Sequence, residues 1–172
     1  MAILDIITIP DPMLRDKSEP VERVDAELVK FTEDMLETMY DAPGVGLAAV
    51  QVAVPRRVIV MDISRDEDEE RQPLVMINPK ILKVGDEPRL YEEGCLSIPK
   101  IYAEIERPDK IEVEYLDTKG VMQHLKAEGM LSTVIQHEVD HLDGMLFIDY
   151  LSRLKRDRLV KKFHKMQKEE KM

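Results

Sequence analysis

The sequence lacks the features that mark membrane-spanning, secreted and disulfide-bonded proteins. No run approaches the roughly 18 consecutive apolar residues of a transmembrane helix. The first residues, MAILDIITIPDPML, carry no basic stretch before their apolar residues and no small-residue cleavage pattern, so we expect no secretory signal and a cytoplasmic location. Cys95 is the single cysteine, which excludes an intrachain disulfide and is, taken alone, more typical of a small buried apolar residue.

Basic residues are also in deficit. The 172 residues include 25 Lys and Arg against 35 Asp and Glu, a formal net charge of −10. Because phosphate binding needs a basic surface, we expect neither nucleic acid as the main partner nor direct DNA binding. We expect no membrane contact either. The length suits one domain over residues 1–172 that buries a sizeable core.

Three segments are typical of helices. In residues 25–40, apolar side chains recur at spacings of three and four, Asp25 stands where a helix cap belongs, and Pro43 and Gly44 follow the end. Residues 129–141 predict a second helix that stops before Gly144. Residues 153–170 predict a charged third helix, whose inward face carries the apolar side chains Leu154, Val160, Phe163 and Met166.

Segments of β-rich composition predict short strands. We expect strands at residues 57–62, 74–78, 81–84 and 102–106, with a break between the second and third at Asn78 and Pro79. Residues 110–116 and 121–126 predict a hairpin around the turn 117–120. The charged run SRDEDEER at 64–71 indicates a solvated loop. Strands that do not alternate regularly with helices favour an α+β fold.

A short motif in the second helix carries most of the chemical information. QHEVDHLDG, residues 136–144, contains H-E-x-x-H, which is typical of a metal-binding helix. His137 and His141 are four residues apart and share one helix face, while Glu138 lies about 100° further round and can act on water as a general base. A catalytic metal usually has three protein ligands and one open position, so a third ligand must lie elsewhere.

The third ligand has two possible sources. Zinc peptidases of the usual kind take it from downstream, where the candidates are Asp143, Asp149, Asp157, His164, Glu169 and Glu170. None is convincing, because the H-x-x-G-x-x-H extension is absent and the last two stand at a charged terminus. Upstream, Cys95 follows Gly94 and precedes an extended run at 96–99, and a thiolate is a strong ligand for Zn(II) or Fe(II). Residue types alone do not decide between these sources.

Three motifs together resemble those of bacterial peptide deformylases: GVGLAAVQ at residues 44–51, EGCLS at 93–97 and QHEVDH at 136–141. The resemblance covers nearly the whole chain, including the opening PDPMLR and the closing LFIDYLSRLKR. It implies an α+β fold in which short strands form antiparallel or mixed sheets around a central helix that bears HExxH. The predicted N-terminal and C-terminal helices would lie around this centre.

The resemblance also implies a reaction. A deformylase hydrolyses the N-formyl group of the N-terminal formyl-methionine of newly synthesised proteins and releases formate. Cys95, His137 and His141 would hold one divalent metal ion per chain, Fe(II) in the native protein and Zn(II) or Ni(II) in some purified proteins. Glu138 would act first as general base and then as general acid.

The formylated chain end would be surrounded by further residues. By resemblance, the side-chain amide of Gln51 and the backbone N–H of Leu96 would stabilise the oxyanion. The substrate, an N-formyl-methionyl nascent polypeptide, would lie extended and pair with Val45 and Gly46 on one side and Gly94 on the other. The methionine side chain would enter an apolar pocket that Val45 forms with three residues of the second helix, Met130, Thr133 and Val134.

Nascent chains as substrates imply a transient ribosome contact. The C-terminal helix is the candidate surface, although a charged helix face is ordinarily only solvated. Its basic residues include Lys155, Arg156, Arg158, Lys161 and Lys162.

Four positions depart from the usual pattern of the family. Val50 stands where Pro is usual, Ala53 replaces a common Gly, and Lys100 follows Ser-Ile-Pro where Gly or another residue is common. Thr133 is more polar than the usual pocket residue. None of these changes removes a catalytic group, but Lys100 and Thr133 bear on peptide binding.

Two other functions remain open from the residues alone. An HExxH zinc endopeptidase would need a downstream third ligand, and it would keep its metal and its activity without Cys95. A non-catalytic metal-binding module would need a closed site, which usually has four protein ligands, and it would give Glu138 no role.

Overall fold

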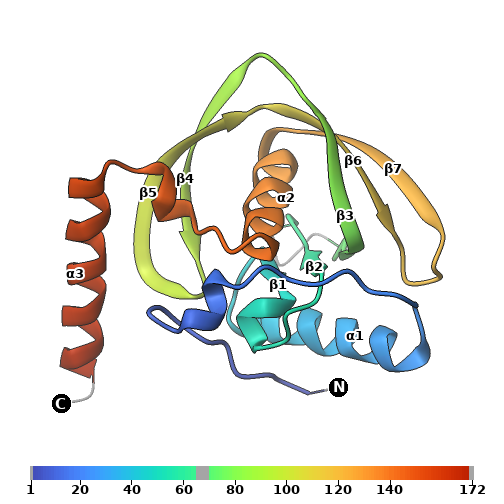
Figure 1. The fold of residues 1–172 in the computed structure, drawn as a ribbon, viewed down its shortest axis with the longest axis horizontal. Helices are drawn as coiled ribbons and strands as arrows, with labels where there is room; N and C mark the ends of the chain where they lie inside the picture. The colour runs from blue at the N-terminus through green and yellow to red at the C-terminus, as the bar shows by residue number, and fades with distance from the viewer. Residues whose placement is uncertain (1, 65–69, 171–172) are drawn as a thin grey trace.

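The computed structural model describes residues 2–64 and 70–170 (Figure 1). Within them the chain forms three α-helices: α1 Ala26–Asp41, α2 Gly129–Leu142 and α3 Arg153–Glu170. The strands are β1 Gly46–Ala48, β2 Val58–Met61, β3 Leu74–Val84, β4 Pro88–Cys95, β5 Ile98–Pro108, β6 Lys110–Leu116 and β7 Met122–Glu128. Single 3-10 turns lie at η1 Pro12–Arg15, η2 Ala49–Val52 and η3 Phe147–Tyr150.

Two sheets enclose α2. Five strands pair in the order β1-β2-β3-β6-β7, and β4 pairs with β5 in a separate two-stranded sheet. Figure 1 shows α2 between the two sheets, with α1 packed beside β1 and β2 and α3 at the outer side of β5. The predicted α+β fold is confirmed, and the residues of the HExxH motif lie on α2. Each pair of neighbouring strands in the two sheets is antiparallel.

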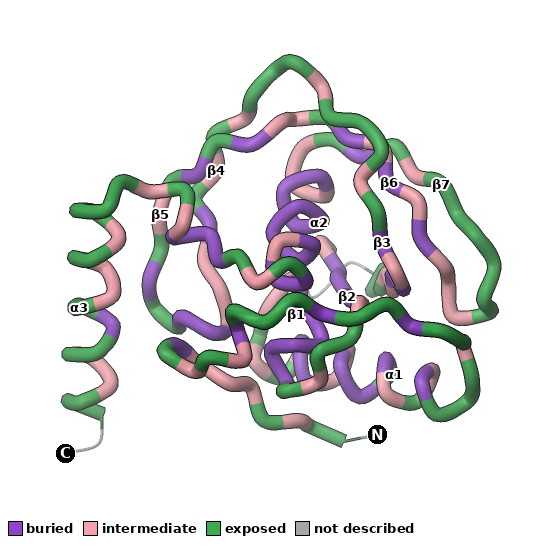
Figure 2. Tube along the Cα trace, viewed as in Figure 1, coloured by how far each residue is buried: buried purple, intermediate pink, exposed green. Residues whose placement is uncertain are grey.

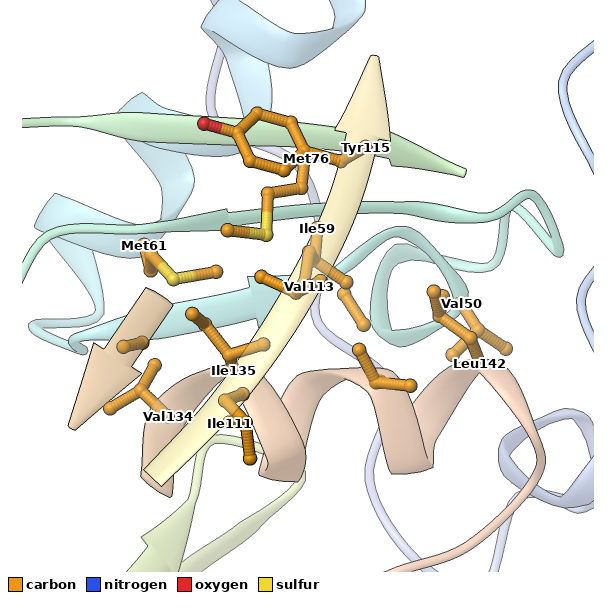
Figure 3. Packing of buried hydrophobic residues seen from close by; sticks show 13 residues of the cluster. Val50, Ile59, Met61, Met76, Ile111, Val113, Tyr115, Val134, Ile135 and Leu142 are labelled. Atoms are coloured by element: carbon orange, nitrogen blue, oxygen red, sulfur yellow. The ribbon is translucent and has the colours of Figure 1, made fainter. Parts of the chain in front are cut away.

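The helix α2 is buried on nearly all sides. Residues 132–139 are all buried, as are His141 and Leu142 (Figure 2). Its apolar side chains Val134, Ile135, Val139 and Leu142 pack against the five-stranded sheet, where Figure 3 shows Ile59, Met61, Met76, Ile111 and Val113 around them. Burial of one such side chain contributes about 1.5–3 kcal/mol. This packing fixes the helix that carries the metal-binding motif.

The strand break predicted at Asn78 and Pro79 is wrong, because β3 runs through both residues. The pairing register with β6 shifts at this point, as in a β-bulge, and Asn78 adopts a φ of 52°. Asn tolerates this left-handed conformation better than most residues, so β3 can form a bulge at Pro79 and continue beyond it. The Asn78 side chain also bonds the N–H and the carbonyl of Val21, at 2.8 Å each, and anchors the N-terminal segment to the sheet.

Most of the other predicted elements are confirmed. The carboxylate of Asp25 caps α1 by accepting a hydrogen bond from the N–H of Leu28 over 2.9 Å. The hairpin of β6 and β7 turns at residues 117–120, and α2 and α3 lie within one residue of their predicted bounds. The strand predicted at 102–106 is the middle of the longer β5, whereas the sequence does not predict β1 or β4.

Two further expectations concern the surface. Leu154, predicted to face inward, is 69% exposed, because it lies on the first turn of α3 and outside the apolar cluster that Phe163 joins. The loop predicted at 64–71 includes residues 65–69, which lie outside the described part of the chain. No helix among the described residues is long and apolar enough to cross a bilayer.

The end of α2 is fixed by a glycine that packs against the N-terminal segment. Gly144 has a φ of 77°, and its N–H donates to the carbonyl of His141 over 3.1 Å. A Cβ at this position would collide with the carbonyl oxygen of Arg15. The segment around η1 therefore lies directly against the turn that ends the metal-binding helix.

We expect Gly144→Ala to destabilise the fold more than Gly129→Ala. Gly129, at the start of α2, also has a positive φ, 64°, but no atom lies within 4 Å of the place a Cβ would take. Gly129→Ala, the control, should therefore lower the free energy of unfolding by only about 1–2 kcal/mol, the cost of its left-handed backbone. Gly144→Ala has the same backbone cost and also the collision with the Arg15 carbonyl. Urea unfolding followed by circular dichroism measures both; equal losses would contradict this packing.

Candidate metal centre

The two histidines of the motif meet a cysteine from a distant part of the chain. His137 and His141 project from one buried face of α2, and Cys95 approaches from the end of β4. Nε2 of His141 lies 3.2 Å from Nε2 of His137 and 3.3 Å from Sγ of Cys95. The three donor atoms lie within 4.8 Å of one another, close enough to bind one ion together.

Cys95 reaches this place because a tight turn joins β4 to β5. Leu96 and Ser97 form the turn, and Cys95 pairs directly with Ile98. The carbonyl of buried Ser97 accepts a hydrogen bond from the N–H of Ile9 over 3.0 Å, which ties the turn to the N-terminal segment. The thiol is therefore positioned by paired strands, which hold a ligand more precisely than a long loop does.

Glu93 orients His137 from behind. Its Oε1 lies 2.9 Å from Nδ1 of His137, so Nδ1 donates and Nε2 is left for an ion. Arg107 donates to the same carboxylate twice, from Nε over 2.6 Å and from Nη2 over 3.0 Å. Burial alone would raise the pKa of Glu93, but the hydrogen bonds from His137 and Arg107 outweigh it and lower the pKa. Glu93 is therefore a buried carboxylate in its charged form.

A second carboxylate completes the surroundings of Arg107. Its Nη1 donates to Oδ2 of Asp140 over 2.8 Å, and the hydroxyl of Tyr150 donates to the same oxygen over 2.7 Å. The guanidinium also lies over the Tyr150 ring, 4.8 Å from its centroid. Because Asp140 belongs to α2 and Glu93 to β4, this network joins the two elements that carry the three candidate ligands.

The charges around the histidines suit a cation. Burial favours the neutral ring of His137, but the charge of Glu138 and the hydrogen bonds with Cys95 and Glu93 outweigh it and raise the pKa of His137 well above its ordinary value. The field that stabilises a proton there also stabilises a metal ion. Burial, together with the charge of His137, lowers the pKa of His141 well below its ordinary value. The neutral form is the one that binds metals. The three residues therefore fit a divalent ion such as Fe(II) or Zn(II).

Glu138 lies beside the ligands without joining them. Burial raises the pKa of this carboxyl to about 7. Its Oε1 is buried and has no hydrogen-bond partner among the described residues. A Cβ at Gly46 would lie only 2.6 Å from Oε2, so the glycine of β1 makes room for the carboxylate. An acid that titrates near neutral pH next to a metal site is suited to proton transfer.

Gln51 faces the cysteine from η2. Its Oε1 accepts from the N–H of Ala48 over 2.9 Å, which fixes the amide group. Its Nε2 donates to Oγ of Ser97 over 3.0 Å and lies 3.5 Å from Sγ of Cys95. Gln51 is 1% exposed, so its N–H groups point into the site rather than into solvent.

A pocket of about 800 Å³ opens in front of these residues. All of the residues predicted to bind substrate line it: Val45, Gly46, Gly94, Met130, Thr133 and Val134. Leu96 and Gln51 line it as well. β1 and β4 are edge strands of their sheets, and residues of both strands line the pocket. Tyr91, Glu92 and Tyr102 also line the pocket, although the sequence analysis did not single them out for binding.

The downstream candidates for a third ligand lie elsewhere. Asp143 pairs with Arg57 over 3.0 Å, and Glu170 pairs with Lys100 over 2.7 Å at the outer end of α3. Of the candidate ligands in the described part of the chain, only Cys95 joins the histidine pair.

Sequence reasoning missed the residues that support the ligands. Glu93, Arg107 and Asp140 carry no spacing signal, because their side chains meet only when β4, β5 and α2 assemble. The available signal was chemical: a metal-binding histidine usually donates its second N–H to a carboxylate or a carbonyl. Glu93, two residues before Cys95, was the nearest candidate.

Comparison with known proteins agrees with this geometry. The family model described as polypeptide deformylase matches residues 3–157. The peptide deformylase of Rhizobium meliloti (strain 1021) is 56% identical over 168 residues, which are 98% of this chain and 96% of that protein. A crystal structure of peptide deformylase from Ehrlichia chaffeensis superimposes with a TM-score of 0.94 at 41% identity, covering 99% of this chain and 100% of the other.

A second structure from the same organism contains a ligand. It is the Ehrlichia chaffeensis peptide deformylase in complex with actinonin, with a TM-score of 0.90 at 44% identity, covering 96% of this chain and 98% of that one. The fold, the histidine pair and the sequence similarity agree. The chain therefore belongs to the polypeptide deformylase family, whose members are metal-dependent hydrolases.

Proposed function

We propose that this protein removes the N-formyl group from the N-terminal formyl-methionine of newly synthesised polypeptides and releases formate. One observation carries the proposal: the donor atoms of Cys95, His137 and His141 lie within 4.8 Å of one another in a pocket that Glu138 also lines, and Oε1 of Glu138 is buried without a hydrogen-bond partner among the described residues. A small acyl group at the end of an extended chain matches that arrangement.

We infer that Cys95, His137 and His141 hold one divalent ion, Fe(II) in the native protein, with Zn(II) or Ni(II) as alternatives in purified protein. Such an ion supplies Lewis acidity, which lowers the pKa of a coordinated water to about 7. The protein contributes the position of each donor. By its contact with Nδ1, Glu93 would leave Nε2 of His137 to hold the ion, and the β4–β5 turn would bring the thiol of Cys95 to the same place.

Glu138 moves the proton in the proposed reaction. With a pKa of about 7 and a buried Oε1 that has no partner among the described residues, it can take a proton from water. It then gives that proton to the leaving amine, a role typically worth about 10²–10⁴-fold in rate. The carboxylate stays close to the pocket because Gly46 leaves space for it.

Gln51 and Leu96 stabilise the negative oxygen that forms when the formyl carbon is attacked. The Nε2 of Gln51 lies 3.5 Å from the Cys95 thiol, so its N–H groups reach the same region as the ligands. Removal of one such donor typically costs about 3 kcal/mol of transition-state stabilisation. The peptide itself is proposed to add as a strand between β1, through Val45 and Gly46, and β4, through Gly94.

The proposed substrate places the protein near the ribosome, in the cytoplasm. Residues 1–172 would act as one domain, with α3 as the docking surface. Its described residues 153–170 contain eight Lys and Arg against three Asp and Glu, in a chain whose net charge is −10. Co-sedimentation with 70S ribosomes at low salt tests this contact; equal binding by a variant with Lys155, Arg158 and Lys162 changed to Glu would contradict it.

Formate release from formyl-Met-Ala-Ser tests the reaction. We expect turnover by anaerobically prepared protein loaded with Fe(II). Cys95→Ala should lose both metal and turnover, because it removes one of three ligands. Glu138→Gln should keep the metal and lose about 10²–10⁴-fold in kcat, because it removes the base.

The two variants also separate the alternatives. Cys95→Ala protein that keeps its metal and its activity would point to a downstream ligand and an endopeptidase. If the parent protein binds Fe(II), Ni(II) or Zn(II) but releases no formate, the proposed reaction is contradicted.

We expect Glu93→Gln to weaken Zn(II) binding by about 10–100-fold, because it removes the charge that orients His137. Glu92→Gln is the matched control: it is the preceding residue of β4, with an exposed side chain on the opposite face. Competition with a chelating indicator dye measures both affinities, and circular dichroism confirms that both variants fold. Equal affinities for the two variants would show that Glu93 has no part in metal binding.

A further inference from the structure

One wall of the proposed methionine pocket is polar. Thr133 lies on α2 four residues before His137, and it lines the pocket beside Met130 and Val134. It is 3% exposed. A valine has the same shape without the hydroxyl, so the hydroxyl is the feature of this wall that calls for a physical reason.

The hydroxyl has a cationic partner that is not one of the pocket's lining residues. Nη1 of Arg89, on β4, donates to Oγ1 of Thr133 over 3.1 Å. Arg89 is held there by Asp109, whose carboxylate lies 4.0 Å from its Nε, and by the ring of Tyr91, 5.0 Å from its guanidinium. An arginine side chain has only donors, so Thr133 is the acceptor in this bond.

The hydroxyl proton of Thr133 is therefore not used by Arg89. The two threonines of α1 donate theirs within the helix: Thr32 to the carbonyl of Val29 and Thr38 to that of Asp34, over 2.7 Å in each case. Thr133, although also helical, donates to none of the residues in 2–64 and 70–170. A hydroxyl whose oxygen accepts from a cation is also polarised into a better donor. Among the described residues Thr133 thus keeps one uncommitted donor, at a position that lines the pocket.

We propose that Thr133, polarised by Arg89, determines specificity by donating a hydrogen bond to the first side chain of the substrate. This inference rests on the proposed function and extends its substrate class to chains that begin with N-formyl-methionine sulfoxide. The thioether sulfur of methionine is a weak acceptor and gains little from the donor. A sulfoxide oxygen is a strong acceptor, which an entirely apolar pocket would desolvate without a partner and reject.

The test compares substrates within each variant. Formyl-Met-Ala-Ser, its two sulfoxide epimers and formyl-norleucine-Ala-Ser are given to the Fe(II)-loaded parent, Thr133→Val, Arg89→Met and Met130→Leu. The measured quantity is the ratio of kcat/KM for the sulfoxide to kcat/KM for methionine. A general change in activity or metal content cancels in this ratio. Met130→Leu is the control that changes the pocket wall without changing its hydrogen bonding.

Thr133→Val should lower the sulfoxide-to-methionine ratio about tenfold for the preferred epimer, the effect of one buried hydrogen bond. Arg89→Met should lower it less, and Met130→Leu should leave it within about twofold. The norleucine-to-methionine ratio should change less than the sulfoxide ratio in Thr133→Val. A sulfoxide-to-methionine ratio in Thr133→Val equal to that of the parent would overturn the proposal.

A binding experiment separates this inference from the proposed reaction. Calorimetry with the product peptides Met-Ala-Ser and Met-sulfoxide-Ala-Ser needs no turnover, and the ratio of their Kd values should shift in Thr133→Val by the same factor. Absence of formate release from formyl-Met-Ala-Ser would refute the reaction alone, whereas an unchanged Kd ratio would refute the role of Thr133.

Discussion

The site depends on the burial of charge against α2. Glu93 and Arg107 form a buried ion pair, which Asp140 joins from a partly buried position, and buried ions are costly unless they are paired and hydrogen-bonded. Arg107 donates hydrogen bonds to both carboxylates. Glu93 in turn accepts from Nδ1 of His137 and so fixes the orientation of that imidazole. Removal of Arg107 would leave both carboxylates without their cationic partner, so this shared arginine holds β4 and α2 in a single arrangement. That arrangement places the Cys95 thiol opposite the two imidazoles.

The same packing produces the pocket. The two sheets stand on either side of α2, and each ends in an edge strand, β1 or β4, at the pocket. Under the proposed function, an extended peptide would find backbone partners on both sides while its formyl end reached the base of the pocket. Glycine is required at Gly46, where a side chain would strike the Glu138 carboxylate. Gln51 is held beside the Cys95 thiol by its hydrogen bonds with Ala48 and Ser97.

Local sequence patterns correctly predicted the features that depend on residues close together in the chain. The period of α1, its Asp25 cap, the HExxH spacing on α2 and the β6–β7 hairpin depend on neighbouring residues, and all four are present. The third ligand was ambiguous from residue types, because the approach of Cys95 to α2 depends on the assembled sheets. The resemblance to peptide deformylases is what pointed to Cys95 as that ligand. The course of β3 through Pro79 depends on the bulge at Asn78 and the contact with Val21, which no local pattern records. The support of His137 by Glu93 and Arg107 is non-local for the same reason.

X-ray absorption spectroscopy of the Zn(II)-loaded protein tests the three-ligand site most directly. Cys95, His137 and His141 predict one sulfur at about 2.3 Å and two imidazole nitrogens at about 2.0–2.1 Å, with the remaining position taken by a lighter atom. The sulfur contribution should vanish in Cys95→Ser. A parent protein without sulfur in its first coordination shell, or with a carboxylate in the place of the thiolate, would contradict the assignment of Cys95 as the ligand that completes the site.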